Sequence, residues 1–126
     1  IQSIDFEDMA KKMMGRFPNL KQVIATRRDT LSASHNRLTG LFYDGKNYLE
    51  SPTFELNPII DRIGGGDAFM AGFIYGSLKN SDPIYALTFA TAASALKHTI
   101  EGDFNLASVA EIEQIMQGDT TGRLLR

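Results

Sequence analysis

The sequence predicts an α/β fold, and three observations lead to that prediction. Apolar residues recur at helical spacing near the start of the chain and again in three segments after residue 66. Short β-branched or alternating segments, which are typical of strands, lie between the first helical segment and the others. The glycine-rich stretch Asp61–Asp67 marks the change from strands to helices. This order describes an α/β sheet that ends in a helical layer.

The first part of the chain is predicted to contain one helix and one strand. An amphipathic helix that stops near Gly15 is indicated by apolar residues at helical spacing: Phe6, Met9, Ala10, Met13 and Met14. The β-branched run Val23–Ala25 predicts a short buried strand, which the charged residues 27–29 end. The small and polar residues 30–36 are typical of a loop.

Residues 37–50 predict a β-hairpin, because two extended segments flank the turn-forming pair Asp44-Gly45. Residues 51–60 continue in extended form. Pro52 and Pro58 favour an edge or connecting strand there over a central one, since proline cannot donate to a ladder of hydrogen bonds.

Three helices are predicted after the glycines, at about 67–79, 82–98 and 107–117. Asp82 and Pro83 are the expected cap and first-turn residues of the second of these helices. Its alanine-rich stretch, Ala86–Ala95, favours tight packing against another helix.

The composition favours a single globular domain, since the chain has 126 residues and 43% hydrophobic content, enough for a buried core. A formal net charge of −2, from 13 basic and 15 acidic residues, offers neither a basic face for nucleic acid nor a polybasic membrane anchor. The chain has no cysteine, which excludes thiolate catalysis and suits the reducing cytoplasm. No apolar run approaches the roughly 20 residues of a membrane helix.

Three consecutive glycines, Gly64, Gly65 and Gly66, lie between two aspartates immediately before a predicted helix. A structural turn seldom needs more than one glycine, so the cluster indicates close approach of a ligand to the backbone. Amides at a helix N-terminus favour an anion, and we expect these three to form an anion hole. Asp67 would repel a phosphate, but it can accept the proton of a hydroxyl that attacks a γ-phosphorus. The pattern thus points to phosphoryl transfer.

A structural alternative stays open from the residues alone, namely that Asp67 is the N-cap of the helix and the glycines serve a tight turn. Two nucleotide-binding motifs do not fit. A Rossmann fingerprint would need a third glycine or an alanine where Phe69 stands. A P-loop would need a Gly-Lys-Ser or Gly-Lys-Thr triplet, and the chain contains neither.

The segment DRIGGGDAFMAGFIYGSL, residues 61–78, resembles the second signature of the ribokinase-like (PfkB) carbohydrate kinases. That signature has the form Asp-Thr-x-Gly-Ala-Gly-Asp and precedes a helix rich in small residues. The matching positions are Asp61, Gly64, Gly66, Asp67, Phe69, Ala71 and Gly72. Gly65 replaces the usual alanine, and Arg62 replaces the usual small residue. The resemblance covers most of the chain from Val23 onward.

The resemblance implies that residues 1–126 are the C-terminal nucleotide-binding portion of a ribokinase-like three-layer α/β/α sandwich, about the last third of a larger kinase. It assigns Asp67 as the general base and the amides of Gly64–Gly66 as the anion hole for ATP phosphates. The sugar-binding lid and the Asn-x-x-Glu motif that positions Mg²⁺ would lie upstream of Ile1. A chain that starts at Ile1 without methionine fits a cut or processed product.

This assignment leads us to expect that the chain alone has negligible kinase activity. Cutting a parallel sheet would expose an apolar edge and face, so we also expect self-association or a homo-oligomer.

Three segments most resemble the 2-keto-3-deoxygluconate kinases, which phosphorylate a sugar acid with ATP: SASHN (32–36), DRIGGGDAF (61–69) and HTIEGDFN (98–105). Asp103 falls where some of these kinases contact the substrate, and its alternative role is a solvated loop acid. Fructose, ribose or a nucleoside are alternative substrates. Two other functions stay open, a nucleotide-binding module without catalysis and a structural fragment held by partners.

Other charged residues carry weaker predictions. Arg27 or Arg28 could approach nucleotide phosphates, although the family's Thr-Leu-Gly-x-x-Gly pattern is absent there and surface charge is the alternative. His35 and His98 are not spaced as a metal pair, so no zinc site is predicted. The segment KHTIEG, residues 97–102, would lie beside the adenine in the kinases that the chain resembles.

Overall fold

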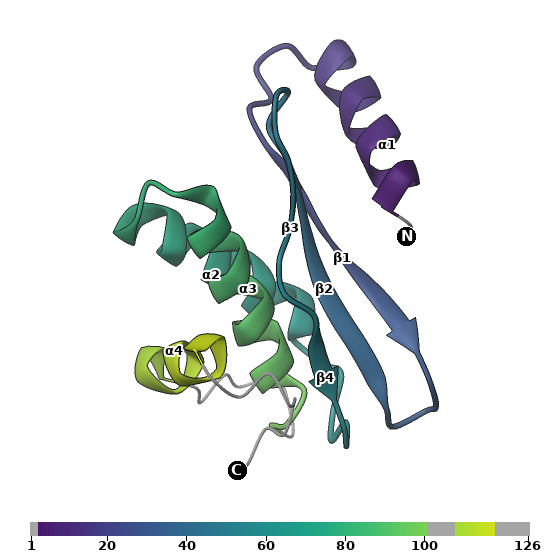
Figure 1. Ribbon diagram of the computed structural model, residues 1–126, viewed down its shortest axis with the longest axis vertical. Helices are drawn as coiled ribbons and strands as arrows, with labels where there is room; N and C mark the ends of the chain where they lie inside the picture. The colour runs from purple at the N-terminus through teal and green to yellow at the C-terminus, as the bar shows by residue number, and fades with distance from the viewer. Residues whose placement is uncertain (1–2, 101–107, 118–126) are drawn as a thin grey trace.

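The computed structural model describes residues 3–100 and 108–117. Within these residues the element order is α1 (Ser3–Arg16), β1 (Val23–Thr30), β2 (Asn36–Tyr43), β3 (Tyr48–Glu50), β4 (Phe54–Leu56), α2 (Gly65–Lys79), α3 (Pro83–Lys97) and α4 (Val109–Gln117) (Figure 1). The predicted α/β class and the change from strands to helices at the glycines are confirmed.

The strand β2 is central, with β1 on one side and with β3 and β4 along its other edge. All of these pairings are antiparallel, so the expectation of a parallel sheet is wrong for the described strands. The reason is the length of the connections, which are too short for the crossover that parallel neighbours need. The predicted hairpin at Asp44-Gly45 joins β2 to β3, and Gly45 has the positive φ of 94° that its turn requires. The predicted edge position of residues 51–60 is confirmed by β4.

The strand β1 is longer than the sequence predicts. Its pairing with β2 runs from Val23 opposite Tyr43 to Thr30 opposite Asn36, so the charged residues 27–29 lie within the strand and do not end it. Their side chains are accommodated because the fold gives two of them partners. Arg27 forms an ion pair with Glu50 at 3.3 Å, and Arg28 bonds to Asn36 at 3.0 Å.

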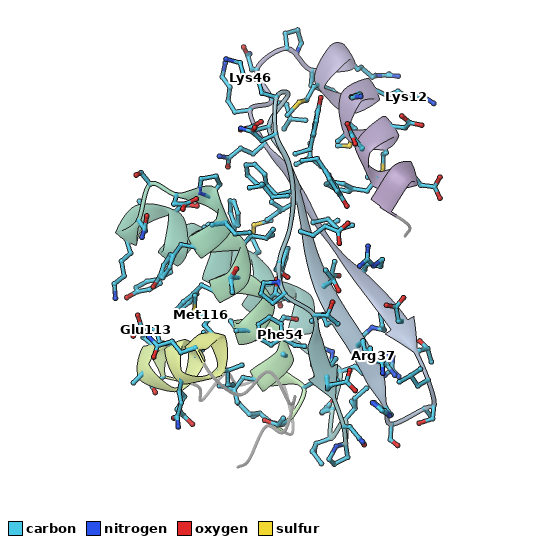
Figure 2. All side chains as sticks on the ribbon, viewed as in Figure 1. Lys12, Arg37, Lys46, Phe54, Glu113 and Met116 are labelled. Atoms are coloured by element: carbon cyan, nitrogen blue, oxygen red, sulfur yellow. The ribbon has the colours of Figure 1, made fainter. Side chains whose placement is uncertain are left out.

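Helices cover both faces of the sheet, which gives three layers (Figure 1). Leu41 and Tyr43 of β2 pack in one core cluster with Phe6 and Ala10 of α1. The alternate residue Phe42 packs with α2 and α3 in a second cluster, as strand geometry requires. Figure 2 shows Phe54 on the sheet side that faces these helices, where it joins a third cluster with residues of α3 and α4.

The helices α2 and α3 pack at very short range through small residues. A Cβ atom added at Gly72 would lie 2.9 Å from the Cα atom of Ala90, and one added at Gly76 would lie 2.7 Å from the Cα atom of Ala86. The predicted packing role of the alanine-rich stretch is confirmed, because Ala86, Ala90 and Ala93 are buried and lie against the glycines of α2.

The helix ends agree with the sequence to within two residues for α2, α3 and α4. Asp82 caps α3 as predicted, since its carboxylate accepts a bond from the amide of Ile84 at 3.1 Å and Pro83 occupies the first turn. Within the described ranges, no helix combines the length and the apolar character that crossing a membrane would require.

One face of α2 has no partner among the described residues. Met70, Ile74 and Leu78 recur at helical spacing on it and are exposed, Leu78 to 85%. In most surface helices the exposed side is polar, whereas this exposed stripe of α2 is apolar.

The contact between α2 and α3 predicts that Gly76→Ala lowers the free energy of unfolding by about 1–3 kcal/mol, because the added methyl group would meet backbone atoms. Gly15→Ala is the matched control, since a Cβ there meets nothing within 4 Å and alanine is the better helix former. Urea unfolding of both variants measures the difference. If Gly76→Ala stabilised the chain as much as Gly15→Ala, the close packing would be disproved.

Candidate functional site

The glycine turn, residues 60–66, leads directly into α2. Gly64 is the N-cap residue, with φ of 83°, a left-handed conformation that glycine adopts without strain. Asp67 lies in the first turn of the helix, is exposed, and makes no capping bond. The alternative that Asp67 is the N-cap is therefore wrong, and its carboxylate is left for another role.

The amides of the turn are only partly engaged. The Gly65 amide donates to the carbonyl of Arg62 at 3.3 Å, a long bond. The amides of Gly64 and Gly66 donate to no acceptor within residues 3–100 and 108–117. A Cβ atom added at Gly66 would meet nothing within 4 Å, so the space beside that residue is open. The turn thus offers donors at the positive end of a helix, where an anion is favoured.

The turn is fixed to the last turn of α3 by main-chain bonds. The amides of Ile60 and Asp61 both donate to the carbonyl oxygen of His98, at 2.9 Å and 3.1 Å. Asp61 also accepts a bond from the amide of Ile63 through its carboxylate, at 3.0 Å. The path of the main chain leading to the glycines is therefore fixed by its bonds to the end of α3 and by an Asx turn at Asp61.

The side chains of Ser94 and Lys97 add to this attachment, and we call Ser94, Lys97 and His98 the α3 anchor. The hydroxyl of Ser94 donates to the carbonyl of Gly65 at 2.9 Å. The ammonium of Lys97 donates to the carbonyl of Ile63 at 2.8 Å. The anchor thus holds carbonyl groups just before and inside the start of α2, while leaving the amides on the same segment available.

Lys97 is buried, with 1% of its surface exposed. A second bond, to the carbonyl of Ile100 at 3.3 Å, adds to its bond with the turn. Burying an ammonium is unfavourable unless carbonyl or carboxylate oxygens replace water, and these carbonyls do so. Removal of Lys97 would leave the carbonyl of Ile63, in the turn, without this donor.

His98 is held in one tautomer. A guanidinium can only donate, so the contact of 2.8 Å from Arg28 Nη2 makes His98 Nε2 an acceptor. A carbonyl can only accept, so the contact of 2.6 Å to the Ser94 carbonyl makes Nδ1 the protonated nitrogen. The ring is therefore neutral, and it joins β1 to the end of α3.

The surroundings of His98 lower its pKa below the ordinary value. Burial is the largest cause. The bond to the Ser94 carbonyl comes next and opposes it by raising the pKa, and the charges of Arg28, Arg62 and Lys97 each lower the pKa by less. Burial also lowers the pKa of Arg28. Three cations near the turn disfavour an imidazolium, and by the same electrostatics they favour an anion at the turn.

Of the other sequence-predicted residues, Arg28 reaches the turn through His98, and the rest pair with residues outside the turn or lie outside the described residues. Arg27 and Arg28 are half-buried in β1 and paired, so neither is the free surface charge of the alternative prediction. His35 lies in the connection before β2 and pairs with Glu55 at 2.9 Å. Asp103 lies outside the described residues. Among residues that the structure describes, no three His, Asp or Glu side chains come together to hold a metal ion.

Sequence reasoning did not predict the α3 anchor. The segment KHTIEG was associated only with a nucleotide base, whereas Lys97 and His98 support the turn itself. A signal was present, because Lys97 directly follows the run of small and apolar residues Ala90–Leu96, and a lysine on the buried side of such a helix needs polar partners.

An apolar pocket of about 190 Å³ lies near the turn, between α2, α3 and α4. Its lining residues are Ala68, Ala71, Gly72, Tyr75, Phe89, Ala93, Val109 and Ile112. Ala68, the residue after Asp67, is one of the lining residues, so the pocket adjoins the first turn of α2.

Comparison with known proteins adds an independent finding. The sequence profile of the family described as "pfkB family carbohydrate kinase" matches residues 22–107. The chain is 30% identical to a 2-dehydro-3-deoxygalactonokinase of Haloferax volcanii over 94% of its own length and 34% of that protein. It is 32% identical to a 5-dehydro-2-deoxygluconokinase of Clostridium botulinum, over 88% of its length and 30% of that protein.

Solved structures give a similar result. A 2-dehydro-3-deoxygluconokinase from Thermotoga maritima is 37% identical, with a TM-score of 0.82 over 90% of this chain and 34% of that one. A PfkB family carbohydrate kinase from Listeria grayi has the same identity and TM-score, 37% and 0.82, over 88% of this chain and 35% of that one. The chain thus spans about a third of the proteins that it matches.

The lowered pKa of His98 predicts a pH dependence of stability. The unfolded chain, with an ordinary histidine pKa near 6.5, binds a proton more readily than the folded chain. The contribution of neutral His98 to the free energy of unfolding is therefore complete above about pH 6.5 and is lost as the pH falls through the folded-state pKa. The free energy of unfolding should fall by at most about 1.4 kcal/mol per pH unit over this range. Urea unfolding between about pH 7.5 and pH 5 measures it.

His98→Asn should remove this part of the pH dependence, whereas His35→Asn should leave it in place. An equal pH slope in the parent chain and in His98→Asn would show that His98 is not buried in its neutral form.

Proposed function

Because the chain belongs to the pfkB family of carbohydrate kinases, we propose that it is the nucleotide-binding and catalytic portion of an ATP-dependent sugar-acid kinase. The proposed substrate is 2-keto-3-deoxygluconate, the acid that the name 2-dehydro-3-deoxygluconokinase denotes. Two of the similar proteins act, by their names, on 2-dehydro-3-deoxy sugar acids, which supports this substrate class. Cytoplasmic location is part of the proposal, since such substrates and ATP are found there.

The observation that carries the proposal is the glycine turn. It combines open amides at Gly64 and Gly66 with the exposed carboxylate of Asp67 at the start of one helix. An anion site alone would be weakened by a carboxylate beside it, whereas phosphoryl transfer to a hydroxyl uses both groups.

The proposed reaction assigns a role to each group. The amides of Gly64, Gly65 and Gly66 bind phosphate oxygens of ATP, and the long bond from Gly65 to Arg62 gives way or is shared. The sugar hydroxyl oxygen forms a bond to the γ-phosphorus while the bond from that phosphorus to the ADP oxygen breaks. Asp67 takes the hydroxyl proton, and the turn and the positive end of α2 stabilise the charge that develops.

Magnesium is not assigned to residues of this chain. Kinases use ATP with Mg²⁺, but the described residues gather no cluster of three acidic or histidine side chains to hold it. We propose that other parts of the intact kinase position the metal ion and close over the sugar, since the chain spans about a third of its relatives. Contact of Asp103 with the sugar stays a prediction.

The apolar pocket between α2, α3 and α4 supports ATP as the phosphoryl donor. It is lined by small residues such as Ala71 and Ala93 and by the aromatic side chains of Tyr75 and Phe89. The adenine ring of ATP is a flat group that can stack on such aromatic and small side chains, while its phosphates reach the adjoining turn.

Self-association of the isolated chain is also part of the proposal. The exposed stripe of Met70, Ile74 and Leu78 is apolar surface that water disfavours. In addition, β1 lies at an edge of the sheet in the described part of the chain, where a further strand could pair with it. Association of two chains would cover such surface.

The proposed general base predicts the behaviour of Asp67→Asn in the intact kinase. Asparagine has nearly the same shape but cannot take up the proton, so kcat should fall by about 10²–10⁴ while the affinity for ATP and the melting temperature change little. Asp82→Asn is the matched control, because asparagine caps α3 as well as aspartate does. Full activity of a folded Asp67→Asn enzyme would refute the catalytic role.

The substrate assignment predicts that the intact gene product phosphorylates 2-keto-3-deoxygluconate with a higher kcat/KM than fructose or ribose. The 126-residue chain alone should show negligible turnover, because it lacks a metal site among its described residues. A coupled assay of ADP release measures both. Higher kcat/KM with fructose or ribose would reassign the substrate, and no turnover with any of the three would leave a nucleotide-binding module as the function.

A further inference from the structure

We propose that His98 is a positioning residue that fixes the start of α2, and that its imidazole ring is the reason why position 65 is glycine. The catalytic consequence rests on the proposed kinase function, whereas the coupling between the two residues does not. The proposal depends on three observations, which concern the space at Gly65, the rigidity of the ring and the direction of the contacts.

The space at Gly65 is filled by His98. A Cβ atom added at Gly65 would lie 2.8 Å from Cε1 of the ring, 3.4 Å from Nε2 and 3.5 Å from Nδ1. The neighbouring Gly66 differs, because a Cβ there meets nothing within 4 Å. The presence of glycine is therefore explained differently at the two positions. At position 65 a side chain would meet the ring of His98, and at position 66 glycine keeps space open for a ligand.

Backbone conformation does not explain Gly65. Among the described residues only Gly45 and Gly64 have a positive φ, so an alanine could adopt the conformation of residue 65. Residue 65 is also the first residue of α2, and alanine is a better helix former than glycine. The contact with His98 is the feature that opposes alanine here.

The ring of His98 cannot move aside to make room. It is 2% exposed, and hydrogen bonds hold both of its nitrogens, from Arg28 to Nε2 and from Nδ1 to the Ser94 carbonyl. Arg28 is itself held by Asn36 at 3.0 Å. A methyl group at position 65 would therefore have to displace the start of α2 rather than the ring.

The contacts run from the sheet to the proposed site. They start at Arg28 and Asn36 in adjacent strands, pass through His98, and reach Gly65 through the ring and Asp61 through the His98 carbonyl. Asp67 follows Gly65 by two residues in the same helical turn. A displacement of Gly65 would thus move the open amide of Gly66 and the carboxylate of Asp67 together.

The test is a double-mutant cycle on the 126-residue chain, with the melting temperature as the measurement. Gly65→Ala should lower the melting temperature of the parent chain. In the His98→Asn background, Gly65→Ala should raise the melting temperature or leave it unchanged. Asparagine keeps a donor for the Ser94 carbonyl but lacks the Cε1 and Nε2 atoms that the added methyl group would meet. Gly66→Ala is the control and should have the same effect in both backgrounds, since its added methyl group meets nothing.

An additive result, in which Gly65→Ala lowers the melting temperature equally in both backgrounds, would overturn the proposal. A second measurement does not require that the variants fold. Long-range ¹H–¹⁵N correlation spectra of the histidine ring in the parent chain should show the neutral form protonated at Nδ1 for His98. A ring protonated at Nε2 would contradict the arrangement.

The catalytic consequence is tested in the intact kinase. Gly65→Ala should lower kcat by about tenfold to a hundredfold with a smaller change in KM, and adding His98→Asn should restore part of kcat. Rescue separates positioning from simple loss of structure. If the parent enzyme has no kinase activity, the proposed function fails while the melting cycle still decides the coupling of Gly65 to His98. If the parent is active and no rescue occurs, the positioning role is wrong.

Discussion

The attachment of the glycine turn to the last turn of α3 is the constraint on which the rest of the site depends. The carbonyl of His98 accepts hydrogen bonds from two amides of the turn. The side chains of Ser94 and Lys97 donate hydrogen bonds to two carbonyls of the turn. These bonds occupy acceptors on the segment and leave the amides of Gly64 and Gly66 without protein partners among the described residues. The turn is therefore held in place by one set of backbone groups while another set stays available for a ligand.

This arrangement requires polar groups in the core. Lys97 and His98 are both buried, yet every buried side-chain nitrogen and oxygen that the structure describes has a hydrogen-bond partner. A fully satisfied polar network in a low-dielectric interior is rigid, since breaking any one bond leaves a costly unpaired group. The same network places positive charge behind the turn, so the groups that determine its shape also favour the anion that we propose it binds.

The sequence predicted those features that depend on neighbouring residues. The helix after the glycines, the cap at Asp82 and the hairpin at Asp44-Gly45 all have local signals. The extent of β1 and the role of His98 could not be predicted in this way, because they depend on residues far apart in the chain. Arg28 and His98 are 70 residues apart, and only the fold brings them together. The replacement of the family's usual alanine by Gly65 was visible, but the ring that opposes alanine was not.

The most direct test of the central claim is an NMR titration of the ¹⁵N-labelled chain with inorganic phosphate and with ATP. If the anchored turn is a preformed phosphate site, the amide signals of Gly64, Gly66 and Asp67 should shift with both ligands in a saturable manner. Signals of the β1–β2 ladder should stay in place, because a preformed site needs little rearrangement of the sheet. Saturable shifts confined to other segments, with the signals of the turn unchanged, would contradict the account.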